Sequence, residues 1–172
     1  MFARNVAVSV LLAFSVNAQV AGQGFKLQTV LNSAKCLTAS SLANGAAVVI
    51  EDCGTNATSL NTWFSTPLGP SGFSSTLSAG GFSSCLDVTG GPSGVAADGT
   101  KLQMWACSAT DGAQEFIFSE GSTIEWGGGI VVDGVKCLCV DVTDGVTTNG
   151  NQLQIWECTG NNSNQKFNMI PV

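Results

Sequence analysis

Histidine and tyrosine are absent from this chain of 172 residues. Without imidazole, the protein cannot use a Ser-His-Asp triad or a Cys-His pair, and it lacks the most common zinc ligand. Charged residues make up only 10% of the sequence, and Lys and Arg together number 6. Since the chain has neither a basic patch nor a basic helix, we expect no nucleic-acid partner and no membrane insertion. We also expect no catalytic residues, no metal site and no cofactor.

Long hydrophobic runs are also scarce, and the only one stands at the N-terminus. Arg4 precedes an apolar run over residues 6–16, and Val16-Asn17-Ala18 then offers small residues for cleavage. This pattern is typical of a secretory signal peptide, and the run is about half the length that crosses a bilayer. We therefore predict a signal peptide at residues 1–18 and a secreted, extracellular protein of a single domain at 19–172.

Helical periodicity is missing from the rest of the chain. No window longer than about ten residues places apolar side chains at helical spacing. Glycine is frequent, with 21 residues, and Ser, Thr and Asn are plentiful. Many short strands joined by turns would have this composition, so the fold class predicted for the mature chain is all-β.

Three segments of the chain share one outline: a strand that starts at a Cys, a turn, and a strand that ends at a Cys. They cover residues 36–53, 85–107 and 139–158. In each segment a turn dipeptide ends eight residues before the last Cys. These dipeptides are Asn44-Gly45, Asp98-Gly99 and Asn149-Gly150. We interpret the chain as three repeats of roughly fifty residues, at about 24–66, 73–118 and 121–170.

The seven cysteines cannot all pair with one another. In a secreted protein such cysteines usually form structural disulfides. The favoured pairs are Cys36–Cys53, Cys85–Cys107 and Cys139–Cys158. Cys137 is then left over, and Cys137–Cys158 is a competing pair because Cys137 and Cys139 point the same way along a strand. A free Cys137 would be either buried or available to link two chains as a dimer.

Strand alternation predicts which side chains share a face. If the two cysteines of a repeat lie directly opposite each other, the antiparallel register places Asp87 opposite Trp105 and Asp141 opposite Trp156. The same register pairs Thr38 with Glu51 in the first repeat. On the outer face of the second repeat, the cysteines are then joined by Asp87, Gln103 and Trp105. The predicted core face comprises Leu86, Val88, Leu102 and Met104.

An aromatic ring beside a carboxylate and an amide suits the binding of a sugar. The face of the ring packs on the C–H face of a pyranose, the carboxylate accepts hydrogen bonds from hydroxyl groups, and the amide both donates and accepts. Such charge-assisted bonds are directional and can distinguish an axial from an equatorial hydroxyl. Because this group of residues recurs in two repeats, we prefer a sugar site to a purely structural role.

The pattern CLDV…DGTKLQMWAC…AQEF resembles the ricin B-type (R-type) lectins and the related carbohydrate-binding modules of xylanases. The resemblance covers roughly residues 24–172 and implies a β-trefoil of three disulfide-linked repeats. The Gln-x-Trp motif of the family ends here in Phe116 and Phe167, and the first repeat reads Asn61-Thr62-Trp63. The implied ligands are glycans of the galactose, N-acetylgalactosamine or xylan type.

The resemblance also implies one sugar pocket in each competent repeat. In the third repeat Asp141 matches the hydroxyl-binding carboxylate, Trp156 the stacking ring and Gln154 the neighbouring polar residue. Asn164 matches the sugar-binding amide, and Gln165 matches the Gln that holds the Asp in place.

The other two repeats match the family pattern less completely. The second repeat keeps the carboxylate, the ring and the two glutamines, which are Asp87, Trp105, Gln103 and Gln114. Ala113 replaces its amide, so weaker binding is expected there. The first repeat, with Thr38, Val49 and Glu51 in the site positions, is expected to be silent.

Two Asn-x-Ser/Thr sequons, at Asn56 and Asn161, predict sites of glycosylation. Trp126 has no counterpart in the other repeats, and we expect it to pack in the core or under a loop.

Two other functions compete with a lectin. A glycoside hydrolase would need two carboxylates flanking a cleft, whereas the recurrent Asp is paired with an aromatic ring. A β-trefoil protease inhibitor or scaffold would act through exposed loops and would not need a sugar pocket.

Overall fold

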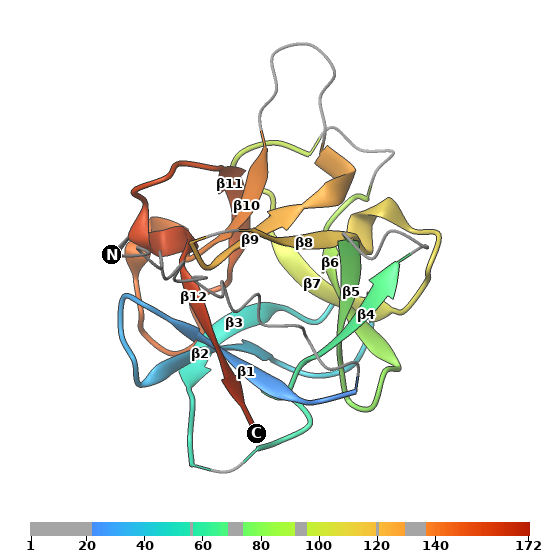
Figure 1. Cartoon of the computed structure of the whole chain (residues 1–172), viewed down its shortest axis with the longest axis horizontal. Coiled ribbons are helices and arrows are strands. Elements are labelled where there is room, and N and C mark those ends of the chain that lie inside the picture. Colours follow the sequence, from blue (N-terminus) through green and yellow to red (C-terminus); the bar gives the residue numbers. More distant parts are fainter. Residues whose placement is uncertain (1–21, 56, 69–73, 92–95, 120, 130–136) are drawn as a thin grey trace, which may run out of the picture.

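The computed structural model describes residues 22–55, 57–68, 74–91, 96–119, 121–129 and 137–172. The predicted signal peptide and the sequon at Asn56 lie outside these residues. Strands and short 3₁₀ helices make up the regular structure of the described part (Figure 1). Within these ranges no helix has the length and apolarity needed to span a membrane. The all-β prediction is therefore confirmed.

The strands of the described part are four to six residues long. In chain order they are β1 (Phe25–Thr29), β2 (Lys35–Ala39), β3 (Val48–Asp52), β4 (Phe64–Leu68), β5 (Ser74–Ala79), β6 (Ser84–Val88), β7 (Leu102–Ala106), β8 (Phe116–Ser119), β9 (Thr123–Trp126), β10 (Leu138–Asp141), β11 (Gln154–Glu157) and β12 (Phe167–Pro171). The 3₁₀ helices are η1 (Gly112–Gln114), η2 (Gly127–Gly129), η3 (Thr143–Gly145) and η4 (Ser163–Gln165).

The strand pairing repeats three times along the chain. The antiparallel hairpins β2–β3, β6–β7 and β10–β11 carry the cysteines of the three repeats. The pairs β4–β5 and β8–β9 join one repeat to the next, and β1 pairs with β12 from Phe25↔Pro171 to Thr29↔Phe167. The first and last strands thus lie side by side, as Figure 1 shows, and close the structure. This arrangement is a β-trefoil, as the resemblance implied.

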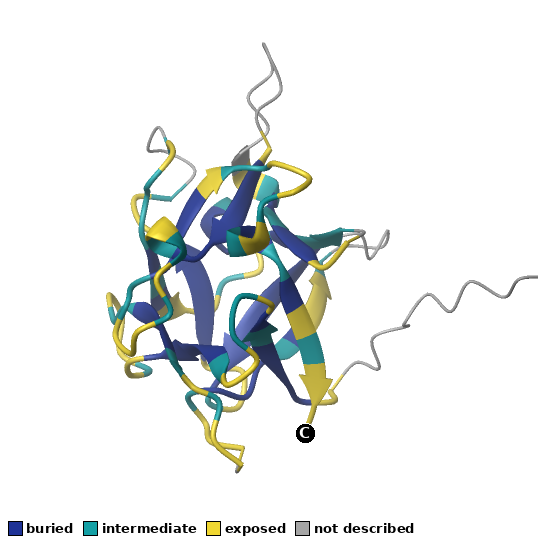
Figure 2. Ribbon diagram, turned by 90° about the vertical axis from the view of Figure 1, so that its left-hand side faces the viewer, coloured by how far each residue is buried: buried dark blue, intermediate teal, exposed yellow. Residues whose placement is uncertain are grey.

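The core lies between the three cysteine hairpins and the strands that join the repeats. Alternate side chains of these hairpins point inward, as the period of two in a strand requires. The inward positions are Leu37, Ile50, Leu86, Met104, Val140 and Ile155, all 0% exposed. Buried segments accordingly fill the centre of the molecule in Figure 2. The predicted core face of the second repeat is confirmed by Leu86, Val88, Leu102 and Met104, which are all fully buried.

Two of the tryptophans belong to this interior. Trp63 is completely buried, and its indole Nε1 donates to the carbonyl oxygen of Leu37 at 3.0 Å. Trp126 is 4% exposed, and its Nε1 donates to the carbonyl oxygen of Gly112 at 2.9 Å. Each ring therefore packs in the core while its single polar group is satisfied. The packing role expected for Trp126 is confirmed.

The register within the hairpins differs from the prediction by two residues. Asp87 lies opposite Gln103, and Cys85 lies opposite Trp105. The prediction was wrong because it placed the two cysteines directly opposite each other. A disulfide depends on the separation and direction of the two side chains and does not need residues that lie directly opposite each other. Cys107, just beyond β7, bonds diagonally to Cys85, with their Cα atoms 5.0 Å apart.

The other two repeats show the same correction. Asp141 lies opposite Gln154 instead of Trp156, and Thr38 lies opposite Val49 instead of Glu51. A shift of two residues preserves the face on which each side chain lies. The predicted division into an outer and an inner face therefore holds although the direct partners change.

The three predicted disulfides are present, as Cys36–Cys53, Cys85–Cys107 and Cys139–Cys158. The alternative pair Cys137–Cys158 is wrong: Cys137 is a free, exposed cysteine. Its backbone carbonyl oxygen instead accepts a hydrogen bond from the N–H of Cys158 at 2.8 Å.

Each turn dipeptide connects its own repeat to the next one. Asn44 Oδ1 accepts the N–H of Ala106 at 2.8 Å, and Asp98 Oδ1 accepts the N–H of Glu157 at 2.7 Å. The turn of the third repeat returns to the first, where Asn149 Nδ2 donates to Asp52 Oδ2 at 3.0 Å. The repeated Asx-Gly signal thus marks three of the places where neighbouring repeats are hydrogen-bonded together.

Candidate functional site

The carboxylate of the third repeat is buried among amide donors. Asp141 ends strand β10 and is only 3% exposed. Gln154, directly opposite on β11, donates from Nε2 to Asp141 Oδ1 at 3.1 Å. Asn162 donates from Nδ2 to Asp141 Oδ2 at 3.4 Å. A carboxylate held by several amides is fixed in direction while it keeps lone pairs for further donors.

The stacking ring predicted for this repeat lies on the same hairpin. Trp156 is two residues after Gln154 on β11, so the two side chains point to the same face of the strand. The ring is 43% exposed. A tryptophan that exposes this fraction in a small domain offers a flat apolar surface to a ligand. The geometry thus places an open ring beside a buried, oriented carboxylate.

The segment after Cys158 completes the group of predicted residues. Gln165, fully buried in η4, donates from Nε2 to the carbonyl oxygen of Glu157 at 2.9 Å and accepts from the N–H of Thr159 at 2.9 Å. These bonds tie the loop to the end of β11. Asn164 Oδ1 lies 2.9 Å from the position that a Cβ on Gly145 would occupy. Because Gly145 also has a φ of +67°, a side chain there would be strained and would displace Asn164.

The second repeat reproduces the same frame. Asp87, 4% exposed on β6, accepts from Gln103 Nε2 at 2.8 Å and from Gln114 Nε2 at 3.2 Å. Trp105 on β7 is 42% exposed and stands two residues after Gln103. Gln114 also donates to the carbonyl oxygen of Ala106 at 3.0 Å. All four residues predicted for this site are brought together.

The two pockets differ in the loop that follows the last cysteine. Ala113 is 1% exposed and faces Gly91, with 3.6 Å between the Cβ of Ala113 and an added Cβ on Gly91. This pair occupies the place of Asn164 and Gly145 in the third repeat. Asp111 replaces Asn162: its Oδ1 accepts the N–H of Ala113 at 3.0 Å. The second pocket therefore has a carboxylate where the third has an amide, and a methyl group where the third has another amide.

Burial raises the pKa of both carboxyl groups above the ordinary 3.8 of aspartate. For Asp141, hydrogen bonds from Gln154, Gln165 and Asn162 act in the opposite direction, and the negative charge of Asp144 adds to the rise in pKa. For Asp87, burial is again the largest cause of the raised pKa. Gln103 and Gln114 lower it, and the charge of Asp111 raises it further. The cause in both pockets is that a buried carboxylate loses hydration.

The equivalent place in the first repeat holds a different arrangement. Val49 is 6% exposed, and Thr38 turns its hydroxyl to its own strand, donating to the carbonyl oxygen of Cys36 at 3.2 Å. At the described positions of β2 and β3 there is neither an aromatic ring nor a buried carboxylate, the two groups that the other two hairpins share. The expectation of a silent repeat is consistent with these residues.

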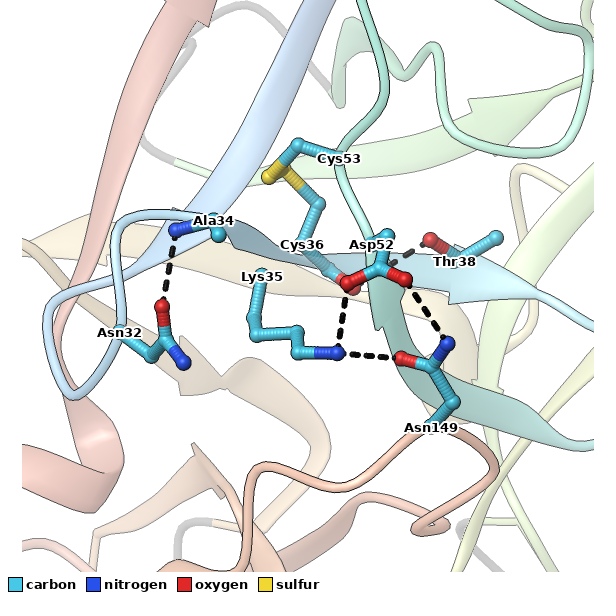
Figure 3. A network of polar contacts seen from close by, with 8 residues as sticks. All are labelled: Asn32, Ala34, Lys35, Cys36, Thr38, Asp52, Cys53 and Asn149. Carbon is cyan, nitrogen blue, oxygen red and sulfur yellow. Dashed lines mark hydrogen bonds and ion pairs between the residues drawn. A yellow bond between two sulfur atoms is a disulfide. The ribbon is translucent and has the colours of Figure 1, made fainter.

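A polar clamp instead occupies the outer end of this first hairpin (Figure 3). Lys35 Nζ contacts Asp52 Oδ1 at 2.6 Å and donates to Asn149 Oδ1 at 2.6 Å. Lys35 and Asn149 both lower the pKa of Asp52 through hydrogen bonds. Figure 3 shows the three side chains turned toward one another across the boundary between the first and third repeats. The clamp therefore joins repeats and resembles neither pocket.

Sequence reasoning missed three residues of the pockets. Asn162 and its counterpart Asp111 each stand four residues after the last Cys of their repeat, a recurrence that could have been found. Lys101, which contacts Gln154 at 3.1 Å, belongs to the second repeat and carries no signal in the sequence of the third. In the ranges that the structure covers, no three His, Cys, Asp or Glu residues are grouped to hold a metal.

A family model described as the ricin-type beta-trefoil lectin domain matches residues 23–167. No curated protein matches the chain.

Solved structures resemble the chain over most of its length. ThreeFoil, a designed threefold-symmetric protein, is 18% identical with a TM-score of 0.70 and covers 87% of this chain and 99% of its own. The C-half of the earthworm R-type lectin, solved in complex with GalNAc, is 17% identical with a TM-score of 0.64 and the same two coverages, 87% and 99%. An exo-β-1,3-galactanase from Clostridium thermocellum has a TM-score of 0.71 at 20% identity, with 88% of this chain matched to 30% of that chain. At these identities the likeness establishes the fold.

Proposed function

The chain belongs to the family of ricin-type β-trefoil lectin domains, and from this premise we propose that it is a secreted lectin that binds galactose-type or related glycans through its second and third repeats. The family supports a role in carbohydrate binding. The pockets, the class of sugar and the secretion are the parts that we propose.

One observation carries the proposal: a buried carboxylate held by amides stands beside an exposed tryptophan ring, and this group occurs twice. In the third repeat Asp141, Gln154 and Trp156 form it, with Asn164 as a second amide. A pyranose has an apolar C–H face that packs on an indole ring, and its hydroxyl groups donate to a fixed carboxylate. The oriented Asp can thereby select between axial and equatorial hydroxyl groups.

The class of sugar that we propose is galactose or N-acetylgalactosamine, with xylan-type glycans as the alternative. The earthworm lectin that shares the fold was solved with GalNAc, which supports the first class. We propose binding without catalysis, because the group that recurs in both pockets is suited to holding a sugar. The galactanase relative contains a domain of this fold within a much longer chain, of which the present fold accounts for 30%.

Each pocket is expected to bind weakly by itself. Shallow sites of this kind contribute on the order of 4–5 kcal/mol, which corresponds to dissociation constants near millimolar to high micromolar. Two pockets on separate repeats can engage two branches of one glycan, and this raises the avidity without any new contact. The natural ligand that we propose is therefore a branched or multivalent glycan.

Secretion, glycosylation and dimerisation complete the proposal. The sequence at residues 1–18 supports export, and the exposed side chain of Asn161 stands next to Asn162, which holds Asp141. A glycan on Asn161 would therefore narrow the approach to the third pocket. The exposed thiol of Cys137 supports a disulfide-linked pair of chains, which electrophoresis without reducing agent would test.

The proposal is tested by a glycan array that carries galactose, N-acetylgalactosamine, xylan and unrelated glycans. The wild-type protein is compared with the double variant Trp105→Ala/Trp156→Ala, whose fold is checked by circular dichroism. We expect retention on galactose-type or xylan-type glycans, release by free sugar, and no retention of the double variant. Binding by neither protein would contradict a lectin function. Equal binding by both would show that the sugar site does not include the two rings.

A further inference from the structure

The third pocket is built by two repeats. The turn of the second repeat crosses to strand β11 and is hydrogen-bonded to it twice. The N–H of Gly99 donates to the carbonyl oxygen of Ile155 at 2.9 Å, and the N–H of Ile155 donates to the carbonyl oxygen of Thr100 at 2.8 Å. Gly99 lies against the pocket: a Cβ added to it would stand 3.8 Å from Trp156 Cζ3 and 3.9 Å from Gln154 Oε1. The second repeat therefore forms one wall of the third pocket.

Lys101 follows this turn and extends its ammonium group to the same glutamine. Its Nζ donates to Gln154 Oε1 at 3.1 Å and to Thr143 Oγ1 at 2.9 Å. The Thr143 hydroxyl donates in turn to the carbonyl oxygen of Gln152 at 2.6 Å. The ammonium is thus fixed between two acceptors. The Thr143 hydroxyl can only accept from it, because the proton of that hydroxyl is already donated to Gln152.

These contacts determine which way round the Gln154 amide lies. A lysine ammonium has donors only, so it must face the oxygen end of the amide. The NH₂ end is then directed to Asp141 Oδ1, the 3.1 Å contact that holds the carboxylate. If the amide turned over, its oxygen would face the carboxylate and its NH₂ would face the ammonium. Both contacts would become repulsive, so the ammonium and the carboxylate together exclude that orientation.

We propose that Lys101 is a positioning residue of the third sugar pocket: by holding Gln154 Oε1 from the neighbouring repeat, it orients the Gln154–Asp141 pair toward the ligand. The proposal rests on the proposed function for its sugar, and on the contacts of the free protein for its geometry.

The second pocket lacks this support. Isolated bridges pair Lys101 with Gln154 and Ala47 with Gln103, so Ala47 is the counterpart of Lys101. A methyl group cannot donate to Gln103. Gly45, the counterpart of Gly99, has nothing within 4 Å of an added Cβ, so the first repeat does not wall the Trp105 ring in the same way. Substitution of Lys101 should therefore affect one pocket only.

The test uses the full mature chain and its variant Lys101→Met, which keeps the length of the side chain and removes the donor. NMR follows the indole N–H signals of Trp156 and Trp105 during titration with N-acetylgalactosamine, and the side-chain NH₂ signals of Gln154 without sugar. We expect the Gln154 signals to shift, and the affinity reported by Trp156 to fall about five- to tenfold. The affinity reported by Trp105 should stay at the wild-type value.

Two further variants separate positioning from structure. Lys101→Arg keeps a donor-only cation and should restore most of the affinity at Trp156. Lys35→Met removes a different lysine that joins two repeats, in the clamp with Asp52 and Asn149, and should leave both pockets unchanged.

The outcomes distinguish this inference from the proposed function. Unchanged Gln154 signals in Lys101→Met, or an equal loss of affinity at both tryptophans, would overturn the positioning role. If the wild-type protein shows no response to N-acetylgalactosamine at either ring, the proposed sugar class fails. The Gln154 signals of the free protein then still decide whether Lys101 orients the amide.

Discussion

The second and third pockets share a frame and differ in how it is completed. In both, a hairpin brings an Asp opposite a Gln and exposes a Trp two residues further along. The third pocket adds Asn162 and Asn164 from its own loop and Lys101 from the neighbouring repeat. The second has Asp111, Ala113 and Ala47 at those three places.

This difference separates two kinds of structural constraint. Strand pairing and the core on the other face of the strand fix the outward direction of the site residues in all three hairpins, but not their identity. The second and third repeats carry Asp, Gln and Trp there, whereas the first carries Thr38, Val49 and Glu51. The loop and the turn of the neighbouring repeat make few core contacts, and residues there can change without disturbing the fold. In this protein the place of a pocket therefore follows from folding, its frame depends on which residues stand at the outward positions of the hairpin, and its completeness depends on three residues outside the strands.

The largest expected effect comes from removing each ring in turn. Trp156→Ala should weaken binding to a multivalent galactose-type surface by at least about tenfold, about 1.4 kcal/mol, because the better pocket loses its apolar platform. Trp105→Ala should have a smaller effect. Surface plasmon resonance on immobilised glycan measures both, and thermal unfolding provides the control, since exposed rings contribute little to the core. A larger loss from Trp105→Ala would reverse the order of the two pockets.

A smaller gain is expected from repairing the second pocket. Ala113→Asn places an amide next to Gly91, in the way that Asn164 lies next to Gly145. We expect the affinity reported by Trp105 to rise about three- to fivefold, because one hydrogen bond to a sugar is added. The matched control is Ala109→Asn, which puts the same side chain at an exposed position of the same loop. An equal change in both variants would remove Ala113 as the cause of the difference.

The sequence predicted the parts of the molecule that repeat. The spacing of Cys and Asx-Gly recurs three times along the chain, and the Gln and Trp that precede the last Cys occur twice. Strand alternation then assigns faces, so the disulfides, the core and the shared face of Asp87, Gln103 and Trp105 could be predicted. The direct partners could not be predicted, because a disulfide tolerates a diagonal pairing at the end of a hairpin. Lys101 could not be found either, since its partner Gln154 is 53 residues away and no periodicity links them.

The smallest expected effect is on the pH dependence of the two pockets. A protonated carboxyl group loses its charge and part of its capacity to accept hydrogen bonds. The sugar affinity of each pocket should therefore fall as the pH drops through the pKa that its aspartate has in the folded protein. Burial has raised this pKa above 3.8 for both Asp87 and Asp141, so the loss should begin at a higher pH than for an exposed aspartate. Stability changes in the opposite sense. A carboxyl with a raised folded pKa favours the folded state below the unfolded pKa, and this contribution is lost as the pH rises through the folded pKa. Unfolding caused by these two groups would therefore not explain a loss of binding in acid.

Exchanging the charge of one loop residue in each pocket should shift the acid midpoints of sugar binding in opposite directions. Asp111→Asn removes the negative charge that raises the pKa of Asp87, while the Asn side chain can still accept the N–H of Ala113. The acid midpoint of sugar binding reported by Trp105 should then move to lower pH. The reciprocal variant Asn162→Asp removes a donor to Asp141 Oδ2 and adds a charge beside it, so the midpoint reported by Trp156 should move to higher pH. NMR titrations with sugar across the acid range measure both midpoints. Shifts in the same direction would show that the loop residue does not set the difference, whereas opposite shifts would assign it to the residue four positions after the last cysteine.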